Sequence, residues 1–190
     1  DPMLDRLNTS LLRLYDNACA PDDFMGLVAF SDNGDDLTIG LGQKSENEGL
    51  HRSTLDIATT STTKNHALCL PVALQMIVDS RETLDHDTFI IMIMDDSAAA
   101  NMVEIASQIE RMERLNEQRS TFFHVLVVCM GVTDPSLLFY CKELTTVSPE
   151  SKFFVLDSGN LDSVFKEIAQ VLTSGLFIRG DLQGISMEQF

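Results

Sequence analysis

Two adjacent carboxylates, Asp95 and Asp96, follow directly on an apolar run, 89–94, and precede Ser97. Such a pair can hold a divalent cation, bind a substrate hydroxyl or cap a following helix. Six consecutive apolar residues are typical of a parallel strand that is buried on both faces. Ligands of open α/β sheets bind at the carboxyl ends of the strands. The sequence therefore predicts that both carboxylates lie where binding usually occurs.

The surrounding pattern predicts the elements that position this pair. Apolar runs predict strands at 24–30, 89–94, 122–130 and 152–156, and amphipathic or apolar segments predict helices at 4–17, 50–58, 67–79, 98–118, 134–145 and 161–172. This alternation predicts an α/β fold with a doubly wound, mostly parallel sheet and helices on both faces. Asn33-Gly34 predicts a hairpin to 37–41, which makes one antiparallel edge strand. We expect one domain, 1–172, and a C-terminal tail, 173–190.

The composition narrows the classes of partner. Thirteen basic residues stand against 29 acidic ones, and the net charge of −16 argues against nucleic acid, whose phosphates need clustered Lys and Arg. The charge is compatible with a cation site or a basic protein partner, although a large negative charge more often serves only solubility. The longest apolar run is far shorter than the ~18 residues of a membrane helix, so we expect no membrane partner. The four cysteines show no CxxC spacing, which favours reduced thiols and a cytoplasmic or other intracellular location.

The order of these elements resembles that of the von Willebrand factor A domain family. The segment FMGLVAFS is similar to the second strand of that family, HALCLPVAL to the helix after its threonine loop, and FIIMIMDDS to its fourth strand. The resemblance covers residues 4–172. It implies a Rossmann-like fold that binds a protein ligand at the top of the sheet, within a larger complex.

The same resemblance implies a metal-ion-dependent adhesion site. In the family, an Asp-x-Ser-x-Ser loop, a threonine and an aspartate hold Mg²⁺, whose preferred ligands are oxygens. Here the resemblance assigns the metal to Asp95 and Thr63. It assigns partner binding to the surrounding polar residues, namely Ser31, Asp32, Asn65, His66, Asp96 and Ser97.

The chain departs from the family at the first strand. It contains no Asp-x-Ser-x-Ser, and no strand precedes Leu4. The resemblance places that strand between 24–30 and 89–94, where its absence leaves two rows of unpaired backbone groups. We expect the strand to come from residues at or before 1–3, from another chain, or from the apolar segment 176–178.

Three functions remain open at this point. A protein-interaction module uses the top face, with Mg²⁺ if the metal site is complete. A metal-dependent or hydrolytic enzyme uses Asp95 and Asp96 beneath a concave pocket. A purely structural domain has neither a binding face nor a catalytic pocket. No GxSxG, P-loop or GxGxxG motif occurs, and we interpret His124 as a core or sheet-face residue of its strand. We favour the non-enzymatic module; its partner and oligomeric state do not follow from the sequence.

Overall fold

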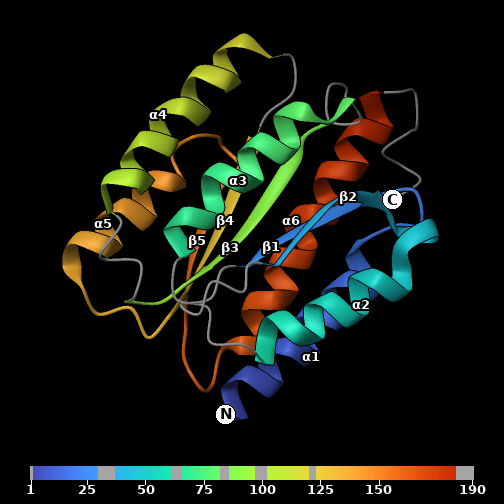
Figure 1. The fold of residues 1–190 in the computed structure, drawn as a ribbon, viewed down its shortest axis with the longest axis horizontal. Helices are drawn as coiled ribbons and strands as arrows, with labels where there is room; N and C mark the ends of the chain where they lie inside the picture. Colours follow the sequence, from blue (N-terminus) through green and yellow to red (C-terminus); the bar gives the residue numbers. More distant parts are fainter. Residues whose placement is uncertain are drawn as a thin grey trace.

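The computed structural model describes residues 2–29, 37–60, 66–81, 86–96, 102–119 and 123–182. Within these ranges six α-helices and five strands follow one another (Figure 1). The helices are α1 (Pro2–Ala18), α2 (Lys44–Thr60), α3 (His66–Asp79), α4 (Met102–Gln118), α5 (Pro135–Leu144) and α6 (Leu161–Leu182). The strands are β1 (Phe24–Ala29), β2 (Leu37–Gln43), β3 (Thr88–Met94), β4 (Phe123–Met130) and β5 (Lys152–Leu156).

The sheet that positions the candidate site is parallel and has the strand order β3-β4-β5. Met94 at the end of β3 pairs with Cys129, and Leu156 at the end of β5 pairs with Met130. All three strands therefore end at one edge, which we call the carboxyl edge. Their starts form the opposite, amino edge.

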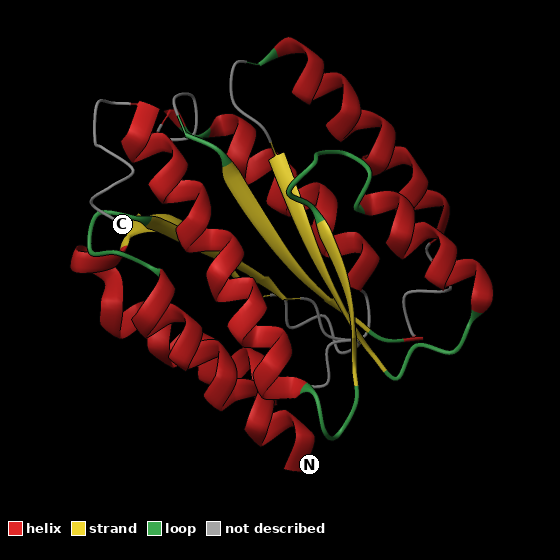
Figure 2. Ribbon diagram, turned by 180° about the vertical axis from the view of Figure 1, so that it is seen from behind, coloured by secondary structure: helices red, strands yellow, loops and turns green. Residues whose placement is uncertain are grey.

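Helices cover both faces of this sheet, as the sequence predicts (Figures 1 and 2). On one face, Met92, Met94, Val125 and Val127 pack among buried side chains of α3, α4 and α5. On the other face, side chains of β4 and β5 pack against α1 and α6. Because β4 lies between two strands and two helical layers, its residues 123–129 are all buried.

The prediction of one continuous sheet is wrong for the described residues. The expected antiparallel pairing is confirmed between β1 and β2, but they form a separate two-stranded sheet. The predicted turn at Asn33-Gly34 lies outside the described residues. Helix α3 packs on both β1 and β3 and so joins the two sheets. The edge of β3 away from β4 has no strand partner within the described ranges, and α3 residues Cys69, Leu70 and Ala73 border a groove of about 80 Å³ along it.

The open edge explains a second correction. Strand β3 was expected to be buried on both faces, yet only Met92 and Met94 are buried and its other five residues are half-buried. An apolar strand loses this much cover when a neighbouring strand is missing from one edge.

Two helices differ in length from their predictions. Helix α2 begins at Lys44, with a break in helical geometry at Asn47, and not near residue 50. Helix α6 continues to Leu182, so the apolar segment 176–178 is helical and does not supply a strand between β1 and β3. No helix among the described residues is long and apolar enough to span a membrane.

Candidate partner-binding face

The carboxyl edge carries an aspartate after each of its three strands. Asp95 and Asp96 follow β3, Asp134 follows β4 and Asp157 follows β5. Residues 95–96, 131–136 and 157–160, which form the described parts of these loops, include no Lys or Arg. The edge is therefore a concentrated source of negative charge, and we call these segments the aspartate loops.

Asp96 joins the first of these loops to the second. Its Oδ1 accepts hydrogen bonds from the backbone N–H of Thr133 at 2.8 Å and of Asp134 at 3.2 Å. Its Oδ2 accepts from the Thr133 hydroxyl at 2.6 Å. The Thr133 hydroxyl first, and then the two N–H groups, hold the pKa of Asp96 below its usual value. The carboxylate thus fixes two loops relative to each other while it stays exposed.

The second loop is shaped by Gly131 and Asp134. Gly131 ends β4 with a φ of +63°, a conformation that favours glycine because other residues place a Cβ against the backbone. Asp134 then caps α5, since its Oδ1 accepts from the N–H groups of Ser136 and Leu137 at 2.9 and 3.0 Å. Pro135 occupies the first helical turn, where no N–H is needed.

The third loop is a closed turn. Asp157 Oδ1 accepts from the N–H groups of Gly159 and Asn160 at 2.7 and 2.9 Å. The Asn160 side chain returns to the strand end, where it accepts from Asp157 N–H at 2.8 Å and donates to the Val155 carbonyl at 2.7 Å. These bonds determine the loop conformation, so all three aspartate loops present preformed surfaces.

The predicted site residues are only partly within the described ranges. Asp95 and Asp96 lie at the carboxyl edge, as the sequence predicts, with Asp95 half-buried. His66 begins α3. The other assigned residues lie outside the described ranges, namely Ser31, Asp32, Thr63, Asn65 and Ser97. Sequence reasoning missed Thr133, Asp134 and Asp157, although each follows an apolar strand just as Asp95 does.

The described residues do not by themselves complete a metal site. They contain no group of three His, Cys, Asp or Glu side chains placed to hold an ion. Both oxygens of Asp96 already accept hydrogen bonds from the second loop. Of the two residues assigned to Mg²⁺, only Asp95 lies within the described ranges. The structure therefore offers one assigned carboxylate, which does not fit Mg²⁺ without further ligands.

A second polar cluster lies at the amino edge and resembles a hydrolase triad in composition. His124 Nδ1 lies 2.7 Å from Ser148 Oγ, and its Nε2 lies 3.5 Å from Asp87 Oδ2. Ser148 is only 6% exposed, however, and its Oγ also bonds Ser151 Oγ at 2.7 Å. A substrate carbonyl has no access to this hydroxyl. The cluster ties the starts of β3, β4 and β5 together, and the interpretation of His124 as a core residue is confirmed.

The chain matches no protein-family model and no curated protein sequence. The geometry of the chain itself must therefore support any functional assignment.

Proposed function

We propose that this chain is a protein-interaction module of the von Willebrand factor A type that binds its partner through the carboxyl edge. The observation that carries the proposal is the set of three aspartate loops on consecutive parallel strands. Asp96 braces two of them through three hydrogen bonds, so a partner would meet a surface that is already ordered. Ordered surfaces bind with a smaller entropic cost.

The arrangement of elements supports the assignment to this type. An antiparallel hairpin precedes three parallel strands, and helices cover both faces of the parallel sheet. Within the described residues, the edge of β3 away from β4 has no strand partner, and β1 and β2 form a separate sheet. This is the position at which the resemblance requires one more strand.

The charge of the face suggests the chemistry of the partner. The aspartate loops carry four carboxylates and no basic residue within their described parts. A partner with exposed Lys or Arg would gain both encounter rate and specificity from such a field. We therefore propose a basic protein surface as the ligand, within a larger intracellular complex.

Metal dependence is tested separately from partner binding. Isothermal titration calorimetry with Mg²⁺ and Mn²⁺ on the wild-type chain and on Asp95→Asn measures whether Asp95 takes part in a site completed by Thr63. Saturable binding that Asp95→Asn abolishes supports the metal site. If neither ion binds, the proposed Mg²⁺ site is rejected and the module binds its partner without a metal.

Partner binding is tested by recovery of proteins from cell extract in Mg²⁺ and in EDTA. The proposal predicts recovery that falls when Asp95 and Asp157 are both changed to Lys, because the field of the carboxyl edge reverses. The matched control changes Glu113 and Glu117, which are exposed on the second half of α4, to Lys and so alters the net charge by the same amount. Equal recovery by both double variants contradicts the proposal.

A further inference from the structure

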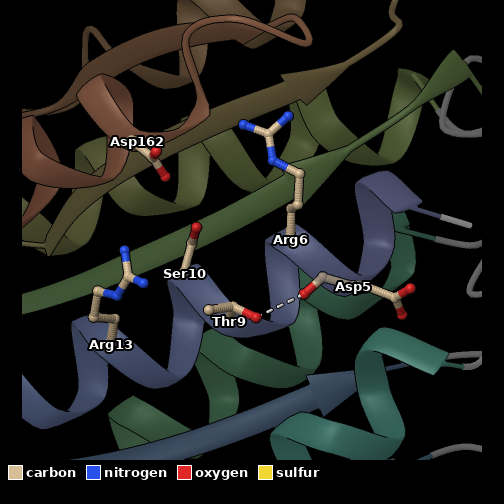
Figure 3. A pocket seen from close by; sticks show the side chains of 6 residues that line it. All are labelled: Asp5, Arg6, Thr9, Ser10, Arg13 and Asp162. Atoms are coloured by element: carbon tan, nitrogen blue, oxygen red, sulfur yellow. Dashed lines mark hydrogen bonds between the residues drawn. The ribbon is translucent and has the colours of Figure 1, made fainter.

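A polar cavity lies between α1 and the first turn of α6, away from the aspartate loops. It encloses about 280 Å³ and is lined by Asp5, Arg6, Thr9, Ser10, Arg13 and Asp162. Figure 3 shows Arg6, Ser10 and Arg13 projecting from the same side of α1 toward Asp162 of α6. The carboxylate of Asp5 points away from Ser10 in this view. Two guanidinium groups and one hydroxyl thus face a single carboxylate.

The spacing along α1 explains why these three side chains converge. Arg6, Ser10 and Arg13 are separated by four and three residues, which places them on one face of a helix. Arg6 and Arg13 are two turns apart, about 10.5 Å along the axis, with Ser10 between them. Long side chains at this separation can reach one small ligand from both ends.

The two arginines differ in their hydrogen bonds to the rest of the protein. Arg6 is anchored, because its Nη1 donates to the Ser158 carbonyl at 2.9 Å. Arg13 is exposed and makes no hydrogen bond or ion pair with any described residue. Neither arginine forms an ion pair with Asp162 in the described structure. Arg13 therefore keeps all its donors for a ligand.

Ser10 gives an independent indication that the cavity accepts a polar group. Its side chain belongs to a residue that is only 6% exposed, yet it forms no hydrogen bond within the described ranges. The hydroxyl oxygen is not among the fully buried side-chain atoms that lack a partner, so it is open to the cavity and available to a ligand. In Figure 3 this hydroxyl points into the space between the two arginines. A ligand oxygen there would satisfy it.

The far wall of the cavity is the first turn of α6. The first helical N–H groups of a helix need acceptors, and the residue before α6, Asn160, uses its side-chain oxygen for Asp157 N–H instead. Asp162, in the first turn of α6, is the residue of this helix that lines the cavity. The positive end of the helix dipole lies at this turn and favours an anion beside Asp162.

We propose that this cavity binds a phosphate group, carried by a monoester or present as the free ion. Two guanidinium forks and a hydroxyl offer more donors than the two oxygens of a carboxylate can use, whereas a phosphate presents three acceptor oxygens and nearly two charges. The carboxylate of Asp162 repels an anion and weakens its binding. The site therefore distinguishes phosphate from carboxylate ligands by the number of hydrogen-bond donors and not by charge alone. The lining as a whole carries two arginines and two aspartates, so the preference for phosphate rests on the donors that Arg6, Ser10 and Arg13 direct into the cavity.

The test is a titration of the ¹⁵N-labelled chain, followed through the amide signals of residues 161–163 and the Nε–H signals of Arg6 and Arg13. The probes are inorganic phosphate, O-phosphoserine and acetate, at an ionic strength held constant with NaCl. We expect saturable shifts with phosphate and O-phosphoserine and at least tenfold weaker binding of acetate. Tighter binding of O-phosphoserine identifies an ester ligand, and equal or tighter binding of inorganic phosphate identifies the free ion; both support the phosphate site.

Three variants make the test specific. Arg13→Gln is expected to weaken phosphate binding at least tenfold without affecting the fold, because Arg13 has no partner to lose. Asp162→Asn is expected to tighten it severalfold. Arg114→Gln removes an exposed arginine of α4 and should change nothing. Unsaturable shifts, equal binding of acetate, or wild-type affinity in Arg13→Gln overturns the proposal.

Discussion

Replacement of Asn116 by leucine is expected to destabilise the chain by about 3 kcal/mol. Asn116 lies near the end of α4 and is 8% exposed. Its Oδ1 accepts from Phe123 N–H at 2.8 Å, and its Nδ2 donates to the carbonyls of Val147 at 2.8 Å and Phe123 at 3.2 Å. One amide therefore holds α4, the start of β4 and the segment before β5 together at the amino edge.

The magnitude follows from the groups that leucine leaves behind. A buried donor or acceptor without a partner costs about 1–3 kcal/mol, and leucine deprives Phe123 N–H and the Val147 carbonyl of theirs. Leucine is close to asparagine in size and more apolar, so part of the cost is recovered through burial. The sum, about 3 kcal/mol, is a large fraction of the stability of a domain of this size.

Urea denaturation followed by circular dichroism measures this change as a lower midpoint at an unchanged slope. Gln118→Leu, two residues further along the same helix end, is the matched control because Gln118 is exposed. It should alter the free energy of unfolding by less than about 0.5 kcal/mol. A loss below about 1 kcal/mol for Asn116→Leu would refute the reasoning that this amide organises the amino edge.

Three further predictions concern single residues. Gly131→Ala should destabilise by about 1–2 kcal/mol in the same urea assay, because φ is +63° there and nothing crowds the site; an unchanged midpoint would count against strain at this turn. The pKa of Asp96 is depressed from 3.8, so its contribution to stability is present above that pH and is lost as the pH falls through the lower folded pKa. The difference in free energy of unfolding between wild type and Asp96→Asn should therefore shrink toward pH 2. A difference that stays constant would contradict this prediction. Burial lowers the pKa of His51, whose Nδ1 lies 2.9 Å from the Tyr15 hydroxyl, so stability should fall as the pH drops below 6.5; an NMR titration that gives His51 a pKa above 6.5 would reverse the sign.

The elements that the sequence predicts well are those whose local signals agree with their burial. Strand β4 is apolar throughout and is covered on both faces and both edges. Helix α5 begins where Asp134-Pro135 predicts, with the cap made by Asp134. The interpretation of all four cysteines as core residues holds only in part, since Cys129 and Cys141 are buried but Cys19 and Cys69 are half-buried.

The sequence-based predictions fail where contacts between residues far apart in the sequence determine burial or where an element begins and ends. The residues of β3 have the composition of a fully buried strand, and only the missing neighbour leaves them half-buried. The first turns of α2 are polar and contain Gly49, so no apolar period marks the start at Lys44. Helix α6 continues past Gly175, a residue that weakens a helix and that suggested an end.

The candidate site also has features that the sequence predicts and features that it does not. The place of Asp95 and Asp96 follows from the apolar run before them, but the role of Asp96 does not. Its partners, Thr133 and Asp134, are 37 and 38 residues away in sequence and come close only because β3 and β4 pair in parallel register. Polar residues after every strand would have been a usable signal.

The central claim is that the carboxyl edge binds a basic protein partner, and a pair of variants on α5 tests it most directly. Ser136→Lys places a positive charge beside Asp134 at the carboxyl edge, and Thr146→Lys places the same charge just beyond the other end of the helix, at the amino edge; both positions are exposed. Quantitative recovery of partner proteins by the two variants is compared with the wild-type chain. The account predicts that Ser136→Lys loses the partner and Thr146→Lys retains it. Equal recovery by both variants, or loss only in Thr146→Lys, contradicts the account.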